Sequence, residues 1–200
     1  MKTRTADTAG VYRVAADLPA DILSKRAKRP GHLRHWRLAR ERVIVGLVLM
    51  PTIRVEETVD VARDALFAVL TDHEGYGRFP GVDKCELIRT GQPERNGLGA
   101  LRRVFSGPLV LDEEIVIYDA PQAFEYLIRR ARPLPVRHTH GRVEFEAIDA
   151  TQTRVVWTST FEIPLPLLGK AIGRRAAAQM TRGFTKAIHA AAALALPQAA

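Results

Sequence analysis

The order of the predicted elements constrains this chain more than any other feature: strand-like stretches come first, and one long amphipathic helix comes last. Seven stretches alternate in side-chain character, and Gly and Pro turn signals separate most of them at intervals of about ten residues, which is typical of an antiparallel meander. These stretches cover 52–59, 82–90, 98–106, 109–119, 122–131, 137–149 and 152–163.

Two segments have a helical period instead. Residues 60–71 repeat apolar side chains at every third or fourth position, which predicts a short helix, and 72–80 continue as a helical turn or loop. Residues 167–196 carry one apolar stripe along a long helix. A sheet with one apolar face needs a covering layer. The sequence therefore predicts an α+β fold, in which a curved antiparallel sheet of six to seven strands wraps around the C-terminal helix.

The charge of the chain changes at Met50. Residues 1–49 contain 11 Lys and Arg against 4 Asp and Glu, whereas 50–200 contain 19 against 18, so the net charge of +8 lies almost wholly in the first quarter. We predict that 1–49 form a basic, disordered extension and that 50–200 form the folded domain. An alternative is that translation starts at Met50, which an intact mass of the native protein would decide.

Partners and compartment follow from the same composition. The basic cluster at 25–42, interleaved with Trp36, suits a phosphate backbone or an anionic membrane as an alternative to a solvated tail. The only cysteine is Cys85, and the longest apolar run, 43–49, is too short to span a bilayer. We therefore expect a cytoplasmic protein. No phosphate-binding loop or nucleophile elbow is present, so we expect no cofactor.

Several short motifs accompany these elements. They are Ala65–Asp72, Tyr76-x-x-Phe79-Pro80-Gly81-Val82, Gly97-x-Gly99, Tyr118–Pro121 with Phe124 and Tyr126, and Thr153–Trp157. In this order and spacing, the chain resembles the START-like, birch-pollen-allergen-like superfamily abbreviated SRPBCC, over residues 52–196. Its polyketide cyclase/dehydrase and lipid-transport branch is the most similar. The resemblance implies a helix-grip fold with a deep hydrophobic cavity. It implies no reaction, because members range from lipid carriers to aromatic-ring cyclases.

Strand alternation predicts which side chains line such a cavity. The aromatic and apolar candidates for ligand binding are Phe79, Phe105, Tyr126, Trp157, Phe161, Met180 and Phe184. The charged candidates are Arg103, Glu113 and Arg130. Glu113 is expected to pair with either arginine inside the cavity and to hold a polar group, and an arginine suits a ligand carboxylate. The alternatives are that the charged groups lie at a solvated rim and that Trp157 and Phe105 are plain core residues.

The candidates for general acid or base chemistry are Glu113, Tyr126 and His138. His138 and His140 share a strand face, but they are in register with Arg142 and Glu144 on the outer face unless a bulge at Gly141 turns one inward. No third ligand stands at a suggestive spacing, so we predict no metal site.

Three functions remain open. The leading hypothesis is a carrier or sensor that binds a small hydrophobic, lipid-like or polycyclic aromatic molecule in an internal cavity. The alternative is a cyclase or dehydratase that acts on a polyketide-like substrate in the same cavity. The third is an accessory module that binds a protein or the ribosome.

Overall fold

The structure, a computed structural model, describes residues 50–196. The strands are β1 (Thr52–Val59), β2 (Lys84–Arg89), β3 (Leu101–Ser106), β4 (Leu109–Asp119), β5 (Ala123–Arg132), β6 (Arg137–Ala147) and β7 (Thr153–Glu162). The helices are α1 (Arg63–Thr71), the 3-10 helix η2 (His73–Arg78) and α2 (Gly169–Ala195). The predicted α+β class and the order of elements are confirmed, although the first helix begins at Arg63 rather than at residue 60.

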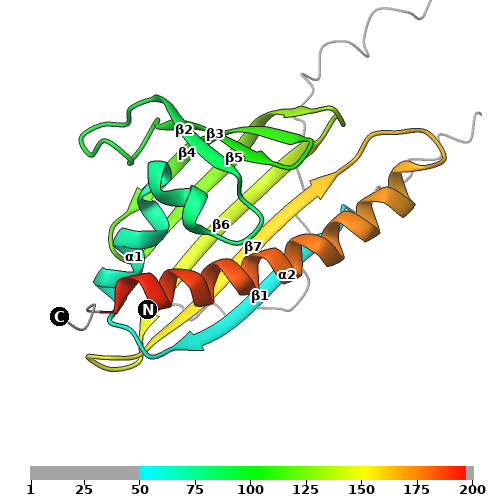
Figure 1. Ribbon diagram of the computed structural model, residues 1–200. Coiled ribbons are helices and arrows are strands. Elements are labelled where there is room, and N and C mark those ends of the chain that lie inside the picture. Colours follow the sequence, from blue (N-terminus) through cyan, green and yellow to red (C-terminus); the bar gives the residue numbers. More distant parts are fainter. Residues whose placement is uncertain (1–49, 197–200) are drawn as a thin grey trace, which may run out of the picture. The chain divides into compact units, whose positions relative to one another are not determined.

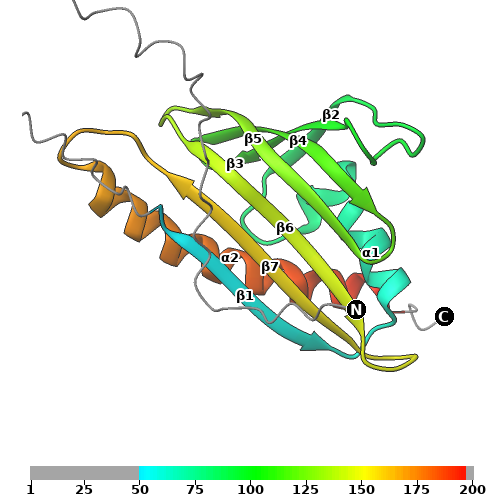
Figure 2. The same cartoon turned by 180° about the vertical axis from the view of Figure 1, so that it is seen from behind.

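All seven strands form one antiparallel sheet in the order β1-β7-β6-β5-β4-β3-β2. The strands from β2 to β7 are a simple meander, and β1 pairs with β7 at the far edge. Figure 1 shows α2 lying across one face of this sheet, with α1 on the same side. Figure 2 shows the opposite face, which none of the described helices, α1, η2 and α2, covers. This is the helix-grip arrangement.

The elements form where the side-chain periods change. Alternate residues of β7, from Thr153 to Phe161, are buried, because they face α2 while their neighbours face the uncovered side. Helix α2 has an apolar stripe whose buried members include Ile188 and Ala191. No helix among residues 50–196 combines the length and the hydropathy needed to cross a bilayer.

One end of the molecule is closed by aromatic packing. Phe67 of α1 lies 6.3 Å from the ring of Phe124 and 5.3 Å from that of Phe145, in edge-on geometry. Leu70 and Ile188 are completely buried beside this cluster. The packing holds α1 and the last turns of α2 tightly against the sheet.

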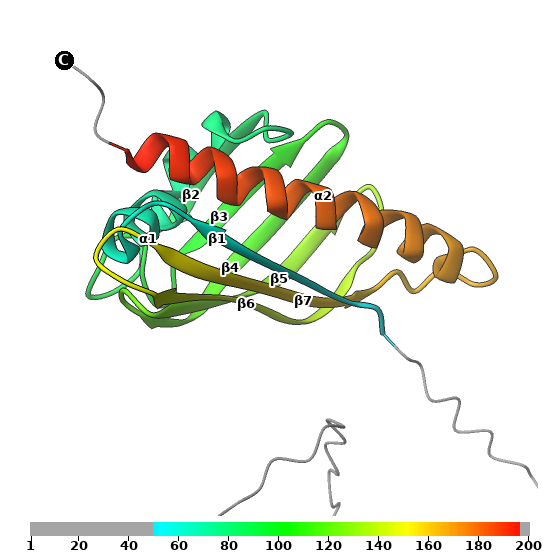
Figure 3. The ribbon, with the colours of Figure 1, turned by 90° about the horizontal axis from the view of Figure 1, so that it is seen from below.

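The middle of α2 packs less tightly. Its fully covered residues concentrate at Ala187–Ala192, whereas Ala176, Met180 and Phe184 are half-buried. Figure 3 shows this part of the helix crossing the sheet beyond the closed end. This looser packing leaves space for a cavity between the middle of α2 and the sheet.

Candidate ligand-binding site

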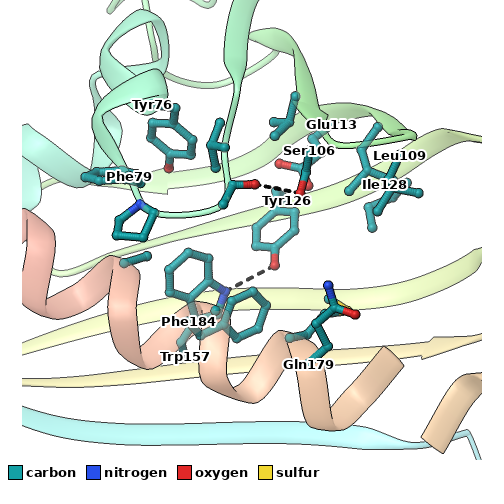
Figure 4. Close-up of a pocket in the computed structure, with 18 of the residues that line it drawn as sticks. Tyr76, Phe79, Ser106, Leu109, Glu113, Tyr126, Ile128, Trp157, Gln179 and Phe184 are labelled. Atoms are coloured by element: carbon teal, nitrogen blue, oxygen red, sulfur yellow. Dashed lines mark hydrogen bonds between the residues drawn. The ribbon is translucent and has the colours of Figure 1, made fainter. Parts of the chain in front are cut away.

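A cavity of about 310 Å³ lies between the middle of α2, the loop after η2 and the inner face of the sheet. Most of its wall is apolar and comes from α2 and the sheet: Ala176, Met180, Gly183, Phe184, Ala187, Val104, Leu109, Leu111, Ile128 and Trp157. The loop and η2 add Tyr76, Phe79, Pro80, Gly81 and Val82, and the polar members are Arg102, Ser106, Glu113, Tyr126 and Gln179. Figure 4 shows Tyr76, Phe79, Tyr126, Trp157 and Phe184 gathered around this space.

Three aromatic side chains build one wall. Trp157 of β7 stacks on Phe184 of α2, with ring centroids 4.2 Å apart and planes 5° from parallel. The indole Nε1 of Trp157 donates a hydrogen bond of 3.1 Å to the Tyr126 hydroxyl (Figure 4). The stack fixes α2 to the sheet at this point, and the hydrogen bond satisfies a buried indole N–H that would otherwise cost free energy.

A buried ion pair closes the inner end of the cavity. The Nε of Arg102 donates to Glu113 Oε2 at 2.8 Å, and Nη2 lies 2.7 Å from the same oxygen. Arg102 is 1% exposed and Glu113 is 7% exposed. The guanidinium also lies 4.4 Å from the centroid of the Tyr76 ring, a cation–π contact. Each charge is therefore compensated, as burial of an ion requires.

His73 forms a further hydrogen bond with this arginine. Its Nδ1 lies 3.0 Å from Nη1 of Arg102, and its Nε2 lies 3.0 Å from the carbonyl oxygen of Asn96. Burial, reinforced by the Arg102 charge, lowers the pKa of His73 to about 2. The neutral ring therefore accepts from Arg102 through Nδ1 and donates to Asn96 through Nε2.

One oxygen of Glu113 remains open to the cavity. Both guanidinium contacts end on Oε2, and no group among residues 50–196 donates to Oε1. Within those residues, the single side-chain polar atom that is both sealed from solvent and unpaired is Asn96 Oδ1. Oε1 is therefore not sealed from solvent, and since Glu113 lines the cavity, we expect this oxygen to be available there as a hydrogen-bond acceptor.

Six of the ten predicted ligand-binding residues lie on the cavity wall: Phe79, Glu113, Tyr126, Trp157, Met180 and Phe184. Whether they contact a ligand stays a prediction. The other four lie elsewhere, each for a physical reason.

Arg103 and Phe105 do not point into the cavity, so that prediction is wrong. The turn at Gly107-Pro108 pairs Ser106 with Leu109, and this register places Arg102 opposite Glu113. Because side chains alternate, Arg103 then faces outward, where it binds Asp112 at 2.6 and 3.0 Å. The expected Glu113–Arg103 pair is replaced by Glu113–Arg102.

Arg130 is also on the outer face, and a β-bulge is the cause. Ile128 pairs with Glu113 but Arg130 pairs with Asp112, so Arg129 is an extra residue in β5. The alternation reverses there, and Arg130 is exposed. A second register shift, between Ile115 and Ile117, likewise turns Ile117 outward, and this residue is 44% exposed.

Phe161 faces inward but is a core residue that does not line the cavity. It is 2% exposed and belongs to the hydrophobic core. Phe161 follows Trp157 farther along β7, and this offset places its side chain outside the cavity.

His138 is buried, and the register shift that turns it inward lies at Thr139 rather than Gly141. Its Nδ1 accepts a hydrogen bond of 3.2 Å from the Ile128 amide, and its Nε2 lies 3.1 Å from the Ser159 hydroxyl. Burial lowers its pKa to about 4, with a smaller contribution from His140. The ring stacks on Tyr126 at 5.3 Å and does not line the cavity, so it supports Tyr126 from behind.

Metal ligation is not favoured by the geometry of the described residues. No group of three or more His, Cys, Asp or Glu side chains within 50–196 is placed to hold a metal ion. The basic cluster predicted at 25–42 to meet nucleic acid or a membrane lies outside the described residues.

Sequence reasoning missed four polar residues: Arg102, Ser106 and Gln179 on the cavity wall, and His73, which contacts Arg102. A signal for Arg102 was present: a two-residue turn at Gly107-Pro108 implies that residue 102 lies opposite 113, so an inward Glu113 requires an inward Arg102. No comparable signal marks His73, because its contact with Arg102 joins η2 to β3 through space.

The sheet, its covering helix and the cavity between them define the class of START-like helix-grip proteins. The chain belongs to the polyketide cyclase/dehydrase and lipid transport family, whose sequence pattern matches residues 50–196. No curated protein matches the chain by sequence.

Solved structures share the fold. A START superfamily protein from Mycobacterium smegmatis aligns with a TM-score of 0.60 and 12% identity, over 72% of this chain and 99% of that one. The Zhui aromatase/cyclase from a Streptomyces species aligns with a TM-score of 0.61 and 21% identity, over 73% and 93%. A Thermus thermophilus protein aligns with a TM-score of 0.61 and 18% identity, over 72% and 97%. At these identities, the likeness concerns the fold alone.

Proposed function

We propose that the protein is a carrier for a small, neutral, largely apolar molecule that bears a hydroxyl group. The observation that supports this most is the cavity of about 310 Å³, whose wall is mainly apolar except for the paired charges at its inner end. Cavities of this size and lining are the common form of small-molecule sites.

The apolar wall supplies the affinity. Burying about 200 Å² of apolar ligand surface contributes about 5 kcal/mol by area, before the losses of translational and conformational freedom are subtracted. Flat aromatic or fused-ring molecules suit the wall formed by Trp157, Phe184 and Tyr126, because they stack on such rings.

The inner end selects the polar group. Arg102 is already occupied by Glu113, so the carboxylate ligand that a free arginine would favour meets a carboxylate oxygen instead. A hydroxyl donates to Glu113 Oε1 without bringing a second net charge into a low-dielectric site. We therefore favour alcohols and phenols over acids.

Native mass spectrometry of the full chain, purified from its own host, tests the carrier function. We expect a defined adduct, and solvent extraction would then identify an apolar hydroxylated molecule. Phe79→Ala is expected to lose the adduct with the fold retained. Phe105→Ala is the matched control, because Phe105 lies outside the cavity. Equal adducts in both variants would remove the site assignment.

Matched probes test the polar selection. We expect 1-naphthol to bind about tenfold or more tightly than naphthalene, since a hydrogen bond to a charged acceptor contributes about 1.5–3 kcal/mol. We expect 1-naphthoate to bind most weakly. Equal affinity for naphthol and naphthalene would contradict the role of Glu113 while leaving the carrier function standing.

A cyclase or dehydratase is the second candidate, and it has one supporting observation. Glu113 and Tyr126 both reach the cavity, and burial raises the pKa of Tyr126, so that its hydroxyl stays protonated and able to donate. A linear poly-β-ketone that loses water in the presence of the protein, but not of its Glu113→Gln variant, would favour this function.

A further inference from the structure

The connection between β7 and α2 ends in two exposed leucines. Leu167 is 102% exposed and Leu168 is 63% exposed. Leu167 also has a φ of 63°, a conformation that a side chain with a Cβ rarely adopts. Figures 1 and 3 show this connection at the end of the molecule away from α1. Adjacent exposed leucines on a strained turn are not explained by folding.

A row of cations on α2 follows directly in the sequence. Helix α2 carries Lys170, Arg174, Arg175, Arg182 and Lys186, and it contains no Asp or Glu. None of these five forms an ion pair with any residue of 50–196, whereas most arginines of the strands do.

The position of Lys170 is unfavourable for the helix itself. It lies in the first turn, where the helix dipole is positive and an acidic residue would stabilise. Helix stability therefore does not account for the charge there. A negatively charged surface in contact with this end would account for it.

We propose that Leu167, Leu168, Lys170, Arg174 and Arg175, here called the docking surface, bind the surface of an anionic phospholipid bilayer. The leucines insert among the acyl chains at the interface, and the three cations lie at the level of the phosphates. A nucleic acid would use the cations alone, so the exposed leucines favour a bilayer.

The docking surface lies next to the cavity, so docking also determines where the cavity is held. Gln179 lines the cavity one helical turn, about 6 Å, beyond Arg175. A docked molecule therefore holds its cavity close to the bilayer. This last step rests on the proposed carrier function, whereas docking itself does not.

Vesicle flotation with the full chain tests docking. The vesicles contain either phosphatidylcholine alone or phosphatidylcholine with about 30% phosphatidylserine, and the variants keep residues 1–49 so that the basic cluster at 25–42 is the same in all of them. Each cation near an anionic surface contributes about a threefold to tenfold factor. We expect the triple variant Lys170→Gln/Arg174→Gln/Arg175→Gln to bind the anionic vesicles at least about tenfold more weakly.

Two further variants make the result specific. Leu167→Ser/Leu168→Ser is expected to reduce binding severalfold at unchanged charge. The triple variant Arg54→Gln/Lys84→Gln/Arg95→Gln changes net charge equally on other surfaces and is expected to bind within about twofold of the wild type. All five docking-surface side chains are exposed, so circular dichroism should show an unchanged fold.

Three outcomes would overturn the proposal. The first is that the triple variant Lys170→Gln/Arg174→Gln/Arg175→Gln binds anionic vesicles as tightly as the wild type, which would assign vesicle binding to other residues. The second is an equal loss in the matched charge control, which would mean that only net charge matters. The third is that the same triple variant binds vesicles like the wild type but binds duplex DNA more weakly, which would identify a nucleic acid as the partner of the docking surface. None of these results bears on ligand binding in the cavity.

Discussion

Gly141 on β6 shows how one residue shapes the site. A Cβ at this position would stand 2.7 Å from Cζ of Tyr126 and 2.8 Å from Cε1 of His138. Only a residue without a Cβ lets the stacked Tyr126–His138 pair lie flat on the strand. Tyr126 in turn accepts the hydrogen bond from Trp157, so the aromatic wall of the cavity depends on this close approach.

Gly141→Ala is therefore expected to destabilise the protein by about 1–3 kcal/mol, the usual range for overpacking a core. Tyr126 must move to admit the methyl group, so binding of an aromatic probe should also weaken. Urea denaturation measures the first effect and probe titration the second. An alanine variant with wild-type stability would show that the ring shifts at no cost.

The buried histidines make stability depend on pH. The pKa of His73 is lowered to about 2 and that of His138 to about 4, both mainly by burial. Because these pKa values lie below the ordinary value of 6.5, the unfolded chain binds more protons as the pH falls below that value. The contribution of these histidines to the free energy of unfolding is therefore fully present above pH 6.5. It decreases below that pH, by up to about 1.4 kcal/mol per pH unit for each histidine.

Urea denaturation at pH 7.5 and 5.0 measures this loss. Between pH 7.5 and 5.0, we expect the free energy of unfolding to fall by about 1–2 kcal/mol less in His138→Gln than in the wild type. Thr139→Ala is the control, because it removes an exposed side chain next to His138 that does not titrate. The same pH dependence in His138→Gln and in the wild type would contradict the lowered pKa.

At the scale of elements, α2 has two functions along its length. Its last turns are fixed by Ile188 and Ala191 in the core, and its middle covers the cavity through Met180 and Phe184. Gly183 lies in that middle part, and a Cβ there would meet no atom within 4 Å. The glycine leaves space in the cavity at the cost of helix stability.

Gly183→Ala is expected to stabilise the protein by about 0.5–1 kcal/mol, since alanine removes the entropic penalty of glycine in a helix. Gly183→Leu is expected to extend into the cavity and weaken probe binding. Thermal denaturation and probe titration of both variants measure these effects. Loss of stability in Gly183→Ala would mean that the space beside α2 is smaller than the structure indicates.

At the scale of the whole molecule, the described residues, 50–196, form the helix-grip fold and are also the residues that match the family. The described part of the cavity wall extends along the chain from Tyr76 to Ala187. The expectation that 50–200 form an independent domain remains a prediction, and so does the disordered extension before it.

A protein consisting of residues 50–200 is expected to melt within a few degrees of the full chain and to bind the same probes. A 1 kcal/mol change shifts the melting temperature of a domain of this size by about 2–8 °C. Differential scanning calorimetry of the two proteins makes the comparison. A much lower melting temperature for residues 50–200 would show that residues 1–49 contribute to the folded structure.

The sequence by itself determined the architecture, because strand and helix periods are local properties of neighbouring residues. It identified all seven strands, the long helix and the aromatic residues Trp157 and Phe184. Alternation also predicted Glu113 and Tyr126 on the inner face, because their stretches of β4 and β5 have no bulge before them. The class and the order of elements follow from these local patterns.

Only the tertiary structure decided which residues surround the buried Glu113. A single extra residue at Arg129 or Thr139 reverses the alternation, and local sequence does not mark such a bulge. The Arg102–Glu113 pair depends on hairpin register, and the contact of His73 with Arg102 depends on η2 packing against the sheet. The polar end of the cavity is therefore set by contacts between distant residues, since a buried charge is stable only where the fold brings its partner.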